Sequence, residues 1–148
     1  MFAAVMILAL CHAGTSPVSA QNLAKGAAAR PQADARSSAA YAEILLKKVQ
    51  AQTQLEALAA EYTDDYPKVT ELRFTLETAE RELARLMAVK PADSARLSLA
   101  LGKLMAGKID AETELWVLRK TLQDAHPDVK RAKRKVDIYE AAIKEILG

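Results

Sequence analysis

His126 is the residue of this sequence whose surroundings come closest to a chemical site. It precedes Pro127, and Asp124 and Asp128 lie two positions to either side of it. An imidazole beside carboxylates can ligate a metal ion or change its charge near neutral pH. A similar stretch sixty residues earlier carries Tyr66 at the equivalent position. We therefore interpret His126 as a turn residue whose ring packs against its neighbours, and we expect no metal site.

A basic cluster follows at the expected start of the last helix. Such a cluster can bind acidic glycans, lipid headgroups or nucleic acid. No aromatic or glycine-rich element accompanies it, so we do not expect nucleic acid, and a solvated helix face explains most of it. Cations are disfavoured at a helix N-terminus, which is a small argument for a bound anion or an acidic partner helix. The cluster consists of Lys130, Arg131, Lys133, Arg134 and Lys135.

The supply of reactive side chains is limited. The only cysteine is Cys11, and the only histidines are His12 and His126. If the N-terminal segment is removed, no thiol and one imidazole remain, which excludes a disulfide framework, a Cys/His zinc site and a cysteine nucleophile. No pair of carboxylates is isolated in a way that suggests acid–base catalysis. We therefore expect a protein that is not an enzyme and binds no cofactor.

Residues 1–20 have the form of an export signal. An unbroken apolar run over 1–10 is followed by small residues that end at Ala20, where we predict cleavage. The run is too short for a permanent membrane span. No Lys or Arg precedes it, so either the signal is weak or the true start lies upstream. Leu10 is larger than the residue that precedes the cysteine of a lipoprotein signal, so we expect no lipid anchor at Cys11 and a periplasmic or secreted protein.

The composition is that of a helical protein. The chain has 148 residues, many of them Ala, Leu, Glu, Lys and Arg, with 5 Gly and 5% aromatic residues. That length allows one domain at most. The net charge of +2 predicts no strong field toward nucleic acid or acidic lipid. Residues 21–35 contain Gly26 and Pro31 without any periodicity, and they predict a flexible linker.

The rest of the chain is an internal repeat, in which one sequence unit occurs twice. Residues 31–88 and 91–148 align without a gap, and 14 of the 58 pairs are identical. A fixed period of this length indicates duplication of one supersecondary unit. We place the first helical repeat at 36–88 and the second at 91–148. The identical pairs include Lys48/Lys108, Leu55/Leu115, Asp64/Asp124, Pro67/Pro127, Val69/Val129 and Glu80/Glu140.

Within each unit, apolar residues recur at alternating spacings of four and three. These residues line one face of each helix, which we call the seam. Such a spacing is typical of helices that pack knobs-into-holes. Lys48 and Lys108 interrupt it at equivalent sites. A charge there can set the register of the helices, but we expect both lysine stems to reach past the seam into water. The expected helices cover about 36–62, 67–88, 94–122 and 127–147.

A short polar break divides each unit into two helical arms. Proline has no backbone donor and suits the first turn of a helix, and the aspartates can accept from the free amides there. The sequence leaves two all-α architectures open. One is a duplicated helical hairpin, with four helices in coiled-coil-like packing; the other is two long helices kinked at proline. We favour the hairpins because polar residues fill the breaks. The break motif comprises Asp64, Tyr66, Pro67, Asp124, His126 and Pro127.

The breaks and the helices after them resemble a known family. The strings YTDDYPKVTELRFTLETAERELARL and LQDAHPDVKRAKRKVDIYEAAIKEI resemble the periplasmic coiled-coil segment of polysaccharide chain-length determinants, the polysaccharide co-polymerases. Tyr66 stands where the family usually has His, and Leu122 replaces the first Tyr of the motif. The sequence carries neither the family's two transmembrane helices nor its membrane-proximal α/β domain. The resemblance therefore implies an isolated, duplicated helical element without the family's activity.

These observations predict a non-enzymatic, exported structural or interaction module. It would act beside envelope polysaccharide or secretion machinery, and its seam would continue into a protein partner or a second copy. Trp116 could anchor such an interface, although ordinary seam packing explains it as well. The alternative is a periplasmic binding module or holdase-like chaperone, whose helical arms and basic cluster hold an acidic ligand or an unfolded client. Salt should weaken the second kind of binding far more than the first.

Overall fold

The computed structural model describes residues 34–148, and this part of the chain is all-helical. The predicted export signal, its Cys11 and most of the predicted linker lie outside the described residues. Residues 34–148 contain two short 3-10 helices and four α-helices of 21 residues each. Their bounds are η2 Ala35–Ser37, α1 Ala39–Ala59, α2 Pro67–Met87, η3 Pro91–Arg96, α3 Leu99–Arg119 and α4 Pro127–Leu147.

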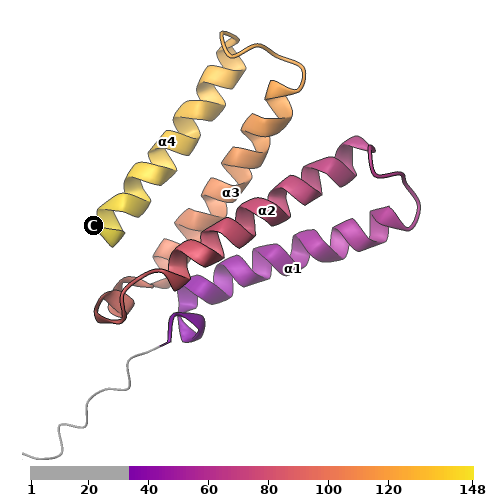
Figure 1. The fold of residues 1–148 in the computed structure, drawn as a ribbon. Helices are drawn as coiled ribbons and strands as arrows, with labels where there is room; N and C mark the ends of the chain where they lie inside the picture. Colours follow the sequence, from indigo (N-terminus) through magenta and orange to yellow (C-terminus); the bar gives the residue numbers. More distant parts are fainter. Residues whose placement is uncertain (1–33) are drawn as a thin grey trace, which may run out of the picture. The chain divides into compact units, whose positions relative to one another are not determined.

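The two units form two helical hairpins, which confirms the first of the two predicted architectures. Figure 1 shows α1 and α2 side by side as one hairpin, and α3 and α4 as another. The bounds of α3 and α4 are those of α1 and α2 displaced by sixty residues, without any deviation. The chain reverses direction at each polar break, so the kinked long helices do not occur.

The first helix of each hairpin starts later than its periodicity predicts. Ser38 caps α1 by accepting a hydrogen bond from the Tyr41 amide at 3.1 Å, and Ser98 caps α3 by accepting from the Leu101 amide at 3.3 Å. The expected starts near 36 and 94 are therefore wrong. A serine at the N-cap ends the preceding turn in extended backbone, so a 3-10 helix and not the α-helix occupies the residues before it.

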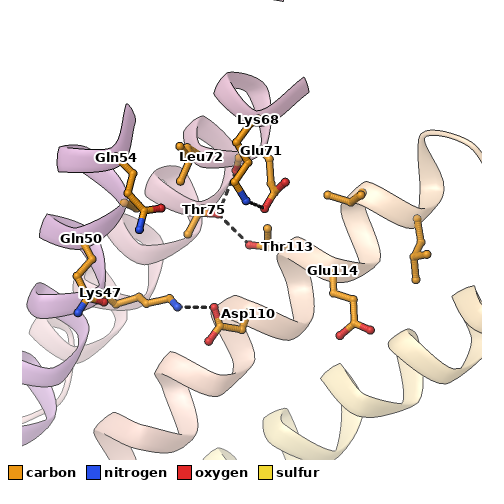
Figure 2. A pocket seen from close by; sticks show the side chains of 13 residues that line it. Lys47, Gln50, Gln54, Lys68, Glu71, Leu72, Thr75, Asp110, Thr113 and Glu114 are labelled. Carbon is orange, nitrogen blue, oxygen red and sulfur yellow. Dashed lines mark hydrogen bonds and ion pairs between the residues drawn. The ribbon is translucent and has the colours of Figure 1, made fainter. Parts of the chain in front are cut away.

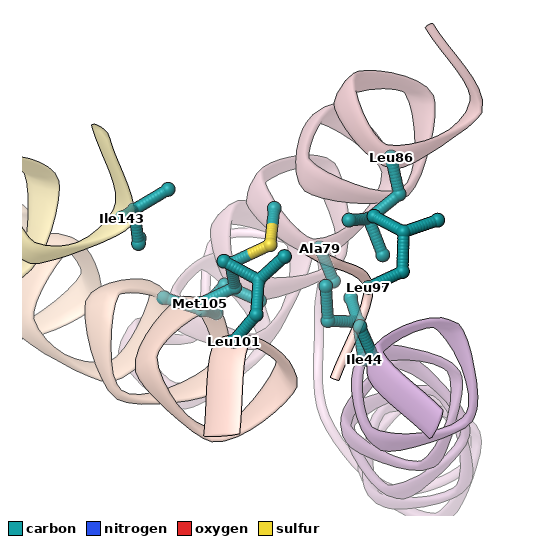
Figure 3. Close-up of a cluster of buried hydrophobic side chains, with 9 residues drawn as sticks. Ile44, Ala79, Leu86, Leu97, Leu101, Met105 and Ile143 are labelled. Atoms are coloured by element: carbon teal, nitrogen blue, oxygen red, sulfur yellow. The ribbon is translucent and has the colours of Figure 1, made fainter. Parts of the chain in front are cut away.

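The seam forms the inside of each hairpin. Ile44 and Ala51 on α1 and Val69 and Leu72 on α2 are buried, whereas Tyr62, beyond the end of α1, is exposed. The main apolar cluster lies where the two hairpins meet, and Figure 3 shows side chains of all four helices in it. It is built from Ala40, Ile44, Ala79, Leu86, Leu97, Leu101, Met105, Ile109 and Ile143.

The hairpins are joined mainly through α3, which lies against α1, α2 and α4. The helices α1 and α3 lie close together at Gly102, where a Cβ atom would lie 2.8 Å from the Cα of Ala40 and 2.9 Å from the Cβ of Glu43. Only a glycine lets the two backbones come so near. Within residues 34–148, none of the helices has the length and apolar character to cross a membrane.

Candidate interaction surface

An ion cluster lies at the junction of the two hairpins, and its central residues, Lys108 and Glu82, are buried. The Lys108 ammonium on α3 donates to Glu82 Oε1 on α2 at 2.7 Å and lies 2.8 Å from Glu140 Oε2 on α4. The side chain of Lys108 is 10% exposed and that of Glu82 is 2% exposed. Arg85 on α2 donates two hydrogen bonds to Glu140, at 3.0 and 3.1 Å. Three helices are thus tied together by charge-assisted bonds.

The expectation that both seam lysines reach water is therefore correct for Lys48 and wrong for Lys108. Lys48 pairs with Glu80 at 2.8 Å, with side chains 29% and 60% exposed. The repeat places Lys108 and Glu140 at the same two positions of the second hairpin. That pair is enclosed because α2 of the first hairpin packs over it and adds Glu82 and Arg85.

The surroundings of these charges shift their pKa values. Burial alone would lower the pKa of Lys108, but its bonds to Glu140 and Glu82 outweigh burial and hold that pKa above its usual value. The guanidinium of Arg85, followed by the Lys108 ammonium, lowers the pKa of Glu140 to about 2 although burial opposes this. Both shifts favour the charged forms of Lys108 and Glu140, and the cluster contains equal numbers of basic and acidic side chains, so it acts as a structural tie. Its members are Arg81, Glu82, Arg85, Lys108, Glu112 and Glu140.

A polar groove of about 420 Å³ runs between α1, α2 and α3 (Figure 2). Lys47 reaches across it to Asp110 at 2.5 Å, and the hydroxyls of Thr75 and Thr113 lie 3.1 Å apart. The remaining charged side chains of its lining also pair within the chain, as Lys68–Glu71 and Lys135–Glu114. The groove therefore offers no unpaired charge with which to select a ligand.

An aromatic pair also joins α2 to α3 across the junction. Phe74 on α2 stacks on Trp116 of α3 with ring centroids 4.8 Å apart. The Lys120 ammonium lies 3.6 Å from the Trp116 ring centroid and donates to Thr70 Oγ1 at 2.8 Å. Trp116 thus anchors an interface, but that interface is the internal one between the hairpins.

The structure places the basic cluster on the surface of α4. Arg131 pairs with Asp128, and Lys135 pairs with Glu114 at 2.8 Å. Lys130, Lys133 and Arg134 are exposed and make no ion pair within the described residues. The cluster therefore offers three cations that remain available to a partner.

The residues of the break motifs make contacts with nearby residues of the same turn and its adjoining helices. The aspartates do not cap the following helices as expected, because Asp64 pairs with Arg73 and Asp124 pairs with Arg119 at 2.9 Å. In the second break, the His126 ring nitrogen Nδ1 accepts from the Asp128 amide at 3.2 Å.

In the first break, Tyr66 occupies the N-cap position of α2 and stacks on Tyr62 with centroids 4.2 Å apart. Pro67 and Pro127 begin α2 and α4, as predicted. Within residues 34–148, no group of three His, Cys, Asp or Glu side chains is arranged to hold a metal ion.

A stripe of apolar side chains is exposed on α1, and we call Leu45, Leu46 and Val49 the α1 stripe. They are 40%, 54% and 49% exposed. Met105 and Ile109, the counterparts of Leu45 and Val49 on α3, are fully buried between the hairpins. A second exposed apolar residue, Ile138 on α4, is 69% exposed, and its counterpart Thr78 on α2 is fully buried.

The four-and-three seam did not reveal these surfaces, because they lie on other faces of the helices. A sequence signal was nevertheless present. Gly102, Met105, Ile109 and Thr113 form a second stripe at helical spacing, and all four are buried. A helix that is apolar on more than one face needs more than one neighbour. Glu82 gave no such signal, since a glutamate on a polar-looking face normally meets water.

The comparisons with known proteins add no relative: the chain matches none of the protein-family models, curated proteins or solved structures with which it was compared. The resemblance to polysaccharide co-polymerases accordingly stays a hypothesis about the break motifs and the helices after them.

Proposed function

We propose that the protein is a non-enzymatic interaction module of the cell envelope, which binds a protein partner through the α1 stripe. The supporting observation is that α1 exposes Leu45, Leu46 and Val49, whereas the counterparts of Leu45 and Val49 on its sister helix α3 are fully buried against another hairpin. Contiguous exposed apolar side chains on a helix are typical of protein–protein contact surfaces.

The export signal and the family resemblance suggest where this module works. Export through residues 1–20 would deliver it to the periplasm or the outside of the cell. The resemblance of its break motifs to polysaccharide co-polymerases favours a place beside envelope polysaccharide or secretion machinery. The helical hairpins would serve there as a rigid support for the apolar surface.

Site-specific photo-crosslinking in living cells tests this function. A photoreactive residue at Leu46 should give a discrete protein adduct, whereas the same residue at the exposed polar position Glu77 on α2 should not. Intact-mass measurement of the purified chain would also show whether cleavage occurs after Ala20. If the probe at Leu46 yields no more adduct than the probe at Glu77, the proposed function is wrong.

The basic cluster supports a second candidate, a periplasmic binding module or holdase-like chaperone. Its supporting observation is that Lys130, Lys133 and Arg134 are exposed without ion pairs in the described part of the chain. Client or glycan binding through these cations should weaken steeply as salt rises, since exposed charges are screened within about 10 Å at 0.1 M salt. Binding through the α1 stripe should change little over the same range.

A further inference from the structure

The junction between the two hairpins has a second, unoccupied version on the outside of the molecule. We propose that a second copy of this chain fills it, with the α1 stripe of one copy docked against α3 and α4 of the next. The inference rests on the proposed function, because it names the partner that the α1 stripe would bind. It follows from comparing the residues that form the internal junction with their counterparts sixty positions away.

The side of the junction contributed by α3 is conserved in type on α1. Met105 and Ile109 are fully buried against the first hairpin, and Thr113 is 8% exposed. Their counterparts on α1 are Leu45, Val49 and Thr53, so apolar residues and a threonine recur at the same spacing. The α1 stripe therefore presents the same kind of surface that α3 already uses to bind a hairpin.

The receiving side of the junction has a counterpart on α4. On α2 this surface includes Thr78 and Glu82, which are 0% and 2% exposed, and Glu82 accepts a hydrogen bond from Lys108 of α3. The counterparts on α4 are Ile138 and Ala142, a more apolar pair. In the contact between copies, Lys48 would take the place of Lys108 and Ala142 that of Glu82. Lys48 does not need a glutamate there, because it already pairs with Glu80 inside its own hairpin.

At the rim of the junction, both contacting residues differ in type from their counterparts sixty positions away. Phe74 and Trp116 stack across the internal junction with centroids 4.8 Å apart. Their counterparts are Arg134 and Glu56, which would meet in the same way between two copies. An aromatic pair is thus replaced by an opposite-charge pair, which would favour the head-to-tail register of docking.

Docking between copies would be looser than the internal junction. Gly102 allows the backbones of α1 and α3 to approach closely, and its counterpart Ala42 carries a Cβ atom. The surfaces that meet are different on the two copies, so the contact is heterologous and leaves one surface of each kind free at the ends. Assembly should therefore be reversible and should grow with concentration.

Two blocked variants of the full chain, studied in the processed form that the expressing cell yields, test the arrangement. Leu45→Glu with Val49→Glu blocks the α1 stripe, and Arg134→Glu with Ile138→Glu blocks the α4 surface. All four positions are exposed, so circular dichroism and thermal melting should match the wild type. In sedimentation velocity at tens of micromolar, the wild type should form dimers and larger species, and each variant alone should be monomeric.

Mixing the two blocked variants gives the decisive result. Each retains the surface that the other has lost, so the mixture should form a one-to-one dimer and nothing larger. If the α4-blocked variant still dimerises by itself, α1 pairs with α1 and the head-to-tail arrangement is wrong. A monomeric mixture, or a monomeric wild type, overturns self-association through these surfaces.

A charge exchange provides the matched control for register. Arg134→Glu alone should weaken self-association by about tenfold, because Glu56 would then face a like charge. Adding Glu56→Arg should restore it, whereas adding Glu77→Arg should not. These outcomes are separable from the proposed function. If the chain stays monomeric while the probe at Leu46 captures another protein, only the present inference fails; if that probe captures nothing, both fail.

Discussion

The helices α1 and α3 are sister elements with different environments. Both carry apolar residues on more than one face, and both are capped by a serine at the same position of the repeat. Yet α3 contains eight buried residues and α1 contains three. The reason is position: α3 lies against α1, α2 and α4, whereas α1 lies against α2 and α3. The same helix type thus forms core in one hairpin and exposed surface in the other.

The two seam lysines show the same asymmetry for charge. Lys48–Glu80 and Lys108–Glu140 are equivalent ion pairs, at 2.8 Å in both hairpins. The first pair is partly solvated, and ion pairs of that kind contribute little to stability. In the second pair Lys108 is 10% exposed beneath α2 and also bonds buried Glu82, so removing this lysine would take the hydrogen bond from a buried carboxylate.

The largest difference between the hairpins should appear when the two lysines are truncated. Lys108→Ala should lower the free energy of unfolding by about 4 kcal/mol, because buried Glu82 loses its hydrogen bond from Lys108 and keeps only Arg85, 3.8 Å away, as an ion-pair partner. Lys48→Ala should cost less than about 1 kcal/mol. Urea unfolding followed by circular dichroism measures both values.

A double variant provides the control for this comparison. Lys108→Met together with Glu82→Leu should recover most of the loss, since an apolar pair can replace a buried ion pair. Equal losses for Lys48→Ala and Lys108→Ala would contradict the asymmetry between the two hairpins.

The second largest effect should be a difference between α1 and α3 in how much their apolar faces contribute to the free energy of unfolding. Met105→Ala should lower the free energy of unfolding by about 3 kcal/mol, because it leaves a cavity in the junction. Leu45→Ala, at the equivalent position of α1, should change it by less than about 0.5 kcal/mol. At protein concentrations high enough for self-association, the same Leu45→Ala should reduce the average mass in solution. A large loss of monomer stability from Leu45→Ala would show that the α1 stripe is already covered within one chain.

The smallest expected effect is the loss, at low pH, of the stability that Glu140 contributes. The pKa of Glu140 lies near 2 in the folded chain and is 4.5 for an ordinary glutamate, so the folded state holds this proton less tightly. The contribution of the Glu140 carboxylate to the free energy of unfolding is therefore complete at pH values above 4.5, and it is lost as the pH falls toward 2. Because the side chain is partly solvated, we expect Glu140→Gln to cost about 2 kcal/mol at pH 7 and much less near pH 2.

Glu80→Gln is the matched control in the first hairpin. It removes the equivalent carboxylate from a largely exposed pair, so it should cost less than about 1 kcal/mol at pH 7. Chemical denaturation of both variants across this pH range tests the comparison. A loss from Glu140→Gln that does not shrink in acid would show that Glu140 stabilises the fold by packing and not by its charge.

Much of each hairpin was predictable because its determinants are local. The seam, Pro67 and Pro127 act over neighbouring turns, and they predicted two helix–break–helix units whose second helices begin at the two prolines. The polar residues of the breaks favoured hairpins over kinked helices. The caps Ser38 and Ser98 were present in the sequence but were not recognised, so the starts of α1 and α3 were placed too early, near 36 and 94. The aspartates of the breaks were misassigned, because Asp64 and Asp124 find arginines on the adjoining helices.

The sequence by itself determined that there are two equivalent helix–break–helix units, because period, proline and polar break recur in each of them, and it favoured hairpins over kinked helices. Only the tertiary structure decided which hairpin covers which. That choice buries Lys108 and leaves Lys48 in contact with water, and it makes Gly102 necessary while Ala42 remains exposed. The physical reason is that burial depends on contacts between residues far apart in the chain. Two equivalent positions acquire different roles once one hairpin packs on the other.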